Sequence, residues 1–268
     1  MGKQLAKLKR RREAKWRLEA INTRRDQTLI IHYSCESFYD IKDGRTPRVT
    51  SIAIRNFESG QTTSFSIHKS AEQNSVEISA IPENYDHLEK IMLDEFFSYL
   101  PTVPVQTFIH WNMRDINYGF QAIEHRYKVL GGTPVIIEDS RKLDLARVLI
   151  SLFGVGYAPH GEVGRMHSIM DLNSITRKDA LTGAEEAKAF DDAEFVKLHQ
   201  STLRKVDVIA NLLERTLDGS LNTASSWRER HGIHPAALLE FLAEHWIWGL
   251  IGVAGVIISI ASGIISFF

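Results

Sequence analysis

The chain has 268 residues, a length that suits one domain of ordinary size with extensions rather than two full domains. Its net charge is −1, but residues 1–25 hold ten Lys and Arg against two Glu, a charge of +8, so the remainder carries −9. The single cysteine, Cys35, excludes an intrachain disulfide and a zinc site built from cysteines.

The first predicted element is a basic helix. Residues 3–25 lack Gly and Pro, are rich in Lys, Arg, Ala and Leu, and carry only a thin apolar stripe. This pattern predicts a helix that is solvated or lies on a surface, and we treat residues 1–26 as a basic N-terminal arm. The arm lacks the apolar run and cleavage site of a secretory signal, so we expect no export.

A mixed set of strands and helices follows the arm. Apolar and β-branched residues at 29–36 predict a strand, and those at 48–57 and 61–69 predict a hairpin with its turn at residues 58–60. Helical periodicity, with helix-ending Gly and Pro, predicts helices at 85–100, 119–130, 141–153, 166–172 and 180–217, and short buried strands at 105–110 and 133–139. We therefore expect an α/β fold, a mixed sheet with helices on its faces.

The C-terminal region predicts a membrane-spanning helix. Residues 218–233 have the composition of a linker, residues 234–268 predict a helix, and residues 246–268 contain no charge. At about 1.5 Å per residue this last stretch spans roughly 34 Å, enough for a hydrocarbon core of about 30 Å. Arg228 and Arg230 flank its near side, so we expect a single-pass, tail-anchored protein with a cytoplasmic soluble domain. The alternative is a buried core helix.

Small residues recur along the predicted membrane helix. They are Gly249, Gly252, Gly255, Ser259 and Gly263. Small residues at this spacing let helices approach closely in lipid, so one interpretation is self-association into a homo-oligomer. The other is that glycine is simply tolerated in membrane helices.

Four runs between residues 27 and 217 stand in a characteristic order: LIIHYSCES, FIHWNMRDINYGF, KLDLARVL and STLRKVDVIANLLERTL. By this order, residues 27–217 resemble the DEDD-type 3′→5′ exonucleases. The family has a ribonuclease H-like fold, a mixed sheet flanked by helices, whose carboxylates hold two Mg²⁺ or Mn²⁺ ions. The resemblance implies that this chain has that fold and binds nucleic acid or nucleotides. Hard carboxylates suit such ions, which activate the attacking hydroxide and steady the leaving oxygen.

In the first two runs, LIIHYSCES and FIHWNMRDINYGF, this chain matches only some of the family's catalytic residues. Glu36 matches the glutamate of the first strand, whereas Ser34 stands where the first aspartate is expected. For the second aspartate, Asp115 lies five residues after His110, and Asn117 lies three before Phe120; we favour Asp115.

The last part of the resemblance contains one match and one displacement. Asp207 matches the final aspartate, but Thr202 stands at the position of the catalytic histidine, and His199 lies three residues before it. The resemblance thus implies Glu36, Asp115, Asp207 and His199 as catalytic residues, the first three holding Mg²⁺ or Mn²⁺. Either an altered constellation is active, or the fold has been retained for binding without cleavage.

The basic arm contains a second group of candidate binding residues. They are Lys9, Arg10, Arg11, Arg12, Lys15, Trp16 and Arg17. Cations can hold the phosphates of RNA or DNA while a tryptophan stacks on a base. The same residues could lie on anionic lipid, or the helix could simply be solvated.

Two functions from different classes follow. The first is a membrane-tethered, exonuclease-like protein that binds or processes nucleic acid at the cytoplasmic face, with an altered or degenerate active site. The second is a membrane effector whose soluble domain senses a ligand or partner and whose membrane helices then oligomerise to perturb the bilayer. A metal-dependent degradation assay and a vesicle-leakage assay distinguish the two.

Overall fold

A computed structural model describes residues 2–37, 46–227, 229 and 240. Its strands are β1 (Thr28–Cys35), β2 (Val49–Asn56), β3 (Thr62–Ser66), β4 (Thr107–His110) and β5 (Lys142–Asp144). Its helices are α1 (Lys3–Thr23), α2 (Ile67–Gln73), α3 (Tyr85–Tyr99), α4 (Phe120–Val129), α5 (Leu145–Phe153), α6 (Gly164–Leu172), α7 (Gly183–Asp191) and α8 (Phe195–Leu217). Short 3-10 helices lie at Arg25–Gln27, Ile78–Ala80, Leu100–Thr102 and Asp139–Arg141.

The five strands form one mixed sheet in the order β3-β2-β1-β4-β5. β1 and β2 are antiparallel, as are β2 and β3, whereas β1 pairs with β4 and β4 with β5 in parallel. The carboxyl ends of β1, β4 and β5 therefore meet at one edge of the sheet, and their amino ends meet at the opposite edge. This arrangement confirms the expected mixed α/β sheet and is compatible with a ribonuclease H-like fold.

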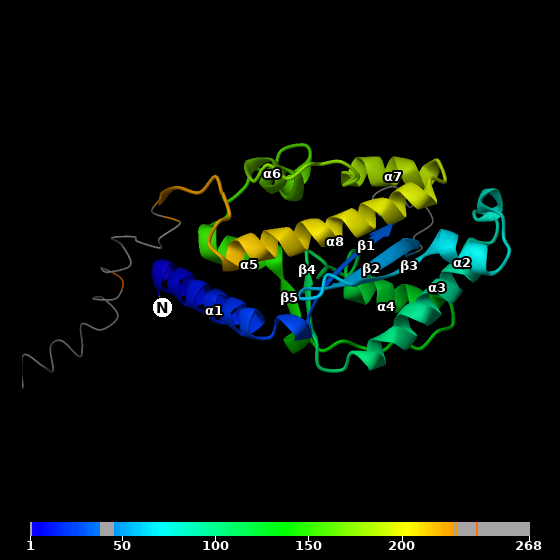
Figure 1. The fold of residues 1–268 in the computed structure, drawn as a ribbon, viewed down its shortest axis with the longest axis horizontal. Coiled ribbons are helices and arrows are strands. Elements are labelled where there is room, and N and C mark those ends of the chain that lie inside the picture. Colours follow the sequence, from blue (N-terminus) through cyan, green and yellow to red (C-terminus); the bar gives the residue numbers. More distant parts are fainter. Residues whose placement is uncertain (1, 38–45, 228, 230–239, 241–268) are drawn as a thin grey trace, which may run out of the picture.

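Helices cover both faces of the sheet (Figure 1). α8 packs across β1 and β2, and with α1, α5 and α6 it encloses a core that includes Ile30 and Ile109. On the other face, α3 and α4 enclose Ile31 and Phe108. Neighbouring residues of each strand thus point into different cores, as the alternation of side chains along a strand requires.

Four predicted elements differ from the structure. Residues 133–139 do not form a strand: Ile136 is exposed, and Pro134 has no N–H to donate to a sheet. The fifth strand is instead Lys142–Asp144, within the stretch predicted as helix. Helix α2 begins at Ile67, inside the predicted strand 61–69, and residues 180–217 form two helices, α7 and α8, rather than one.

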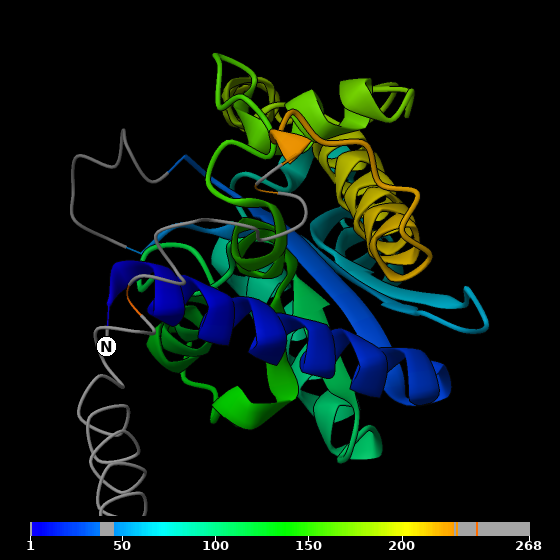
Figure 2. The ribbon, with the colours of Figure 1, turned by 90° about the vertical axis from the view of Figure 1, so that its left-hand side faces the viewer.

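The basic helix α1 packs against the domain. Its apolar residues Ala14, Leu18 and Ile21 are buried in the core shared with α5 and α8, and Figure 2 shows α1 running alongside that part of the molecule. The thin stripe is thus sufficient to dock the helix. Its first turn is held by Glu240, whose carboxylate accepts hydrogen bonds from the backbone N–H groups of Gln4 (2.8 Å) and Leu5 (3.0 Å).

Within the described residues, no helix is long and apolar enough to span a membrane. The predicted membrane segment at 246–268, with Gly249, Gly252, Gly255, Ser259 and Gly263, lies outside those residues. So do Arg228 and Arg230 and, apart from Glu240, the predicted helix 234–268. The membrane anchor and its orientation therefore stay predictions.

Candidate functional site

The position that the resemblance assigns to the first catalytic aspartate lies at the carboxyl end of β1. In sheets with parallel strands, this edge is where ligands are usually bound. Ser34 is buried there, and the register of β1 against β2 shifts between Ser34 and Cys35, an irregularity of the kind that re-aims side chains next to functional sites.

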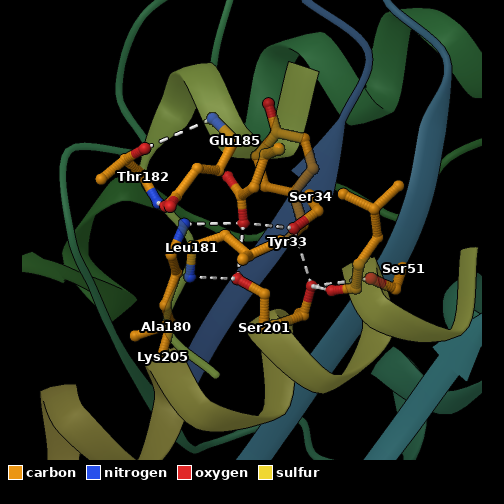
Figure 3. Close-up of polar contacts among 12 residues, drawn as sticks. Tyr33, Ser34, Ser51, Ala180, Leu181, Thr182, Glu185, Ser201 and Lys205 are labelled. Atoms are coloured by element: carbon orange, nitrogen blue, oxygen red, sulfur yellow. Dashed lines mark hydrogen bonds and ion pairs between the residues drawn. The ribbon is translucent and has the colours of Figure 1, made fainter. Parts of the chain in front are cut away.

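Ser34 belongs to a chain of hydroxyl groups that ends at a carboxylate (Figure 3). Its Oγ lies 3.0 Å from Glu186 Oε1 and 2.8 Å from Thr202 Oγ1, and Thr202 Oγ1 lies 2.7 Å from Ser51 Oγ. An ionised carboxylate only accepts hydrogen bonds, so Ser34 donates to Glu186. Each hydroxyl has one hydrogen, and that of Thr202 can be donated either to the Leu198 carbonyl, 3.0 Å away, or to Ser34. The contact between Thr202 and Ser51 can run in either direction.

A second set of contacts closes the network around the same carboxylate. Lys205 Nζ lies 2.6 Å from Glu186 Oε1, and both side chains are largely buried, at 8% and 14% exposure. Ser201 Oγ donates to Glu186 Oε1 at 2.9 Å and accepts from the Leu181 N–H at 3.1 Å. The acidic group beside Ser34 is therefore already neutralised by a lysine.

The start of α7 positions Glu186. Thr182 caps this helix in a capping box with Glu185: the Thr182 side chain accepts from the Glu185 N–H, and the Glu185 side chain accepts from the Thr182 N–H (Figure 3). Glu186 is the next residue, so the cap places its carboxylate in the first turn, facing α8. The sequence Thr-Gly-Ala-Glu indicates the start of this helix, but no local pattern indicates that Glu186 contacts Ser34 and Lys205.

Glu36 and Asp207 lie at opposite ends of the β1–β2 pair. Glu36 follows β1, and its Oε2 accepts from the Arg48 N–H at 3.3 Å. Asp207 forms an ion pair with Arg55, Oδ1 to Nη1 3.3 Å, and Arg55 pairs with Ile30 in the sheet. The six residues from Ile30 to Glu36 span about 20 Å along a strand. The structure therefore does not bring these two carboxylates together.

Asp115 and Asn117 lie on the loop that follows β4, and both are exposed. Asp115 Oδ1 accepts from the Asn117 N–H at 2.9 Å, which makes a local turn. A different acid at this edge, Asp144, has a largely buried side chain: it caps α5 through the Ala146 N–H and pairs with Arg114 at 2.8 Å. Its contacts are those of a structural residue.

These positions do not fit a two-metal centre. The described residues contain no group of three or more His, Cys, Asp or Glu arranged to hold a metal ion. The place beside Ser34 holds the Lys205 ammonium, which repels a divalent cation, and Asp207 is paired with Arg55. The proposed ligand set of Glu36, Asp115 and Asp207 therefore stays a prediction that this geometry does not favour.

His199 lies on α8, in contact with a second histidine rather than with the predicted carboxylates. Its ring centroid is 5.0 Å from that of His68, and its Nε2 has no hydrogen-bond partner in the part of the chain that the structure describes. Burial, with smaller contributions from the nearby His68 and Lys69, lowers the pKa of His199 to about 4.

This low pKa predicts a loss of stability in acid. His199 binds its proton near pH 6.5 in the unfolded chain and only near pH 4 in the folded chain. The stability that neutral His199 contributes is therefore complete above pH 6.5 and is lost as the pH falls towards 4. Through His199 the free energy of unfolding should fall by about 2 kcal/mol between pH 7 and pH 5. Urea unfolding of wild type and of His199→Gln at the two pH values measures this fall. If the free energy of unfolding falls equally in the two proteins, His199 is not its source.

The predicted basic residues of α1 are divided between the domain and its surface. Arg11 is half-buried, and its Nη1 donates to the carbonyls of Leu152 (2.6 Å) and Glu229 (2.7 Å). The others are exposed: Lys9, Arg10, Arg12, Lys15, Trp16 and Arg17. Arg17 pairs with the exposed Glu13 at 3.2 Å, an interaction of small energetic value. α1 therefore presents a group of cations to solvent, spread over the side of the helix that faces away from the domain.

Searches of the chain against family models, curated proteins and solved structures found no match. What the domain does is therefore inferred from its own residues and contacts.

Proposed function

We propose that the chain is a divergent relative of the DEDD-type exonucleases that binds single-stranded nucleic acid at a membrane surface without cleaving it. The observation that carries this proposal is the network of Ser34, Thr202, Glu186 and Lys205. It occupies the position where the resemblance implies a metal-bound aspartate and a catalytic histidine, and its hydrogen bonds and charges are satisfied within the protein.

The loss of chemistry follows from the identity of these groups. A serine hydroxyl is a neutral and weak ligand for Mg²⁺, which prefers carboxylates and phosphates. The one carboxylate beside it, Glu186, is paired with a largely buried ammonium. Hydrolysis by two metal ions requires several carboxylates together, and Asp207 and Glu36 lie at opposite ends of the β1–β2 pair.

The cations of α1 support the binding part of the proposal. Lys9, Arg10, Arg12 and Lys15 are exposed, and their side chains have no ion-pair partner among the described residues. Because α1 is docked on the domain through Ala14, Leu18 and Ile21, these charges are held on its exposed side. A group of cations attracts a phosphate backbone and releases its counterions, whatever the nucleotide sequence.

The contact between Glu240 and α1 places the cations of α1 near the start of the predicted membrane segment. Glu240 holds the first turn of α1 and precedes Trp246 by six residues, which span at most about 21 Å. If residues 246–268 cross a bilayer, α1 begins close to its surface. Recovery of the full-length protein in the supernatant after detergent-free ultracentrifugation would contradict the tether.

A binding and degradation assay tests this function. In it, full-length protein in detergent micelles is incubated with labelled single-stranded RNA or DNA and with Mg²⁺ or Mn²⁺. We expect the strand to be bound and recovered at its original length, with wild type and Glu36→Gln indistinguishable. Metal-dependent shortening that Glu36→Gln abolishes would overturn the loss of catalysis. Absence of binding, together with oligomer-dependent dye leakage from vesicles, would instead favour the membrane effector.

A further inference from the structure

A groove of about 360 Å³ lies beside α1, at the edge of the sheet opposite the Ser34 network. One wall is α1, with Trp16 and Arg17, and Arg24 directly after it. The other is formed where the parallel strands begin, with Gln27 before β1 and Val105 before β4, and with Ser140 before β5. The groove is therefore separate from the site discussed above.

The groove is lined by exposed apolar side chains and by cations. Trp16 is 69% exposed and Val105 is 66% exposed, a costly arrangement for large apolar side chains that share one concave surface. Arg24 is exposed and has no side-chain partner within the described chain, and Arg17 has only its weak surface pair with Glu13. Guanidinium groups bind phosphate through paired hydrogen bonds, and an indole ring offers a stacking surface for any base.

We propose that this groove binds one nucleotide of a single strand, with its base stacked on Trp16 and its phosphate held by Arg17 and Arg24. The inference rests on the proposed function and assigns a subsite to it. The volume lies within the range of pockets that hold small molecules. Gln27 and Ser140 supply hydrogen-bonding groups for the edge of the base without restricting which base is accepted.

The structure favours nucleic acid over lipid as the occupant. A helix that lies in a bilayer interface exposes a broad apolar face, whereas the apolar residues of α1, Ala14, Leu18 and Ile21, are buried in the domain. The groove also lies towards the end of α1 away from Glu240. From Gln4 to Trp16 the helix rises about 18 Å, which moves Trp16 away from the predicted membrane entry.

Fluorescence anisotropy of a labelled single-stranded oligonucleotide, titrated with full-length protein in detergent micelles, tests the groove. Trp16→Ala and Arg24→Glu should each weaken binding by roughly tenfold, the effect of losing a base stack or a phosphate contact. Trp16→Phe, which keeps a stacking ring, should stay within about threefold of wild type. Trp16 and Arg24 are exposed, so equal melting temperatures are expected and confirm that the variants are folded.

The controls separate this inference from the proposed function. If Trp16→Ala and Arg24→Glu bind as wild type while Lys9→Glu and Arg12→Glu do not, the groove is wrong and nucleic-acid binding by α1 stands. If wild type binds no oligonucleotide, the proposed function is wrong and the groove with it. If Trp16→Ala weakens binding only to vesicles that contain phosphatidylserine, the groove contacts lipid, and its assignment to a nucleotide is overturned.

Discussion

Lys205→Met is expected to lower the free energy of unfolding by about 3 kcal/mol, because it removes the counter-charge of a largely buried carboxylate. In the variant Glu186 keeps the hydroxyl donors Ser34 and Ser201 but loses Lys205, its one ion-pair partner among the residues that the structure describes. Chemical denaturation at neutral pH measures the loss.

The double variant Lys205→Met, Glu186→Gln is the matched control. Its amide oxygen still accepts from Ser34 and Ser201, and no uncompensated charge is left in the protein, so most of the lost stability should return. A single variant as stable as wild type would show that the lysine does not neutralise Glu186. In that case the position beside Ser34 would be available to another cation, and the argument against metal binding would fail.

Reversal of three charges on α1 is expected to have the largest effect on binding. Lys9→Glu, Arg10→Glu and Arg12→Glu together should weaken binding to single-stranded nucleic acid by at least roughly a hundredfold at moderate salt. The slope of log affinity against log salt concentration should become shallower by about 2, since each phosphate contact on a single strand contributes about 0.7. Anisotropy titrations at several salt concentrations give both quantities.

A triple reversal elsewhere controls for net charge. Lys178, Lys188 and Lys197 are exposed and lie on or near α7 and α8, far along the chain from α1. Their reversal changes the total charge by the same amount, so a specific surface on α1 predicts little change in affinity or in salt slope. An equal loss from both triple variants would mean that the overall charge of the protein, rather than α1, governs the association.

Local sequence patterns predicted much of the sheet. β1, the β2–β3 hairpin and β4 were recognisable because apolar and β-branched residues are bounded by turn residues there, and α3, α4 and α8 because apolar residues recur at helical spacing. The fifth strand was missed because its position depends on pairing with β4, which no local pattern records. The apolar run at 133–139 looked more like a strand than Lys142–Asp144 does, yet it lies outside the sheet.

The site was less predictable, because its contacts join distant parts of the chain. Ser34 was noticed as a departure from the family pattern, but its partner Glu186 lies 152 residues away. The helical register of α8 was equally decisive: Lys205 is buried against the sheet, and Asp207, two residues or about 200° further round, is exposed. Asp207, which the resemblance assigns as a metal ligand, is half-exposed and pairs with Arg55 of β2.

The most direct test compares the affinity of full-length protein for a single-stranded oligonucleotide in EDTA with that in Mg²⁺ or Mn²⁺, at equal ionic strength. If the strand is held by α1 and the groove beside it without a metal ion, the affinities will agree within a factor of about two. Tighter binding in Mg²⁺ or Mn²⁺ that Glu36→Gln removes would show that carboxylates and metal ions hold the strand, and would contradict the account.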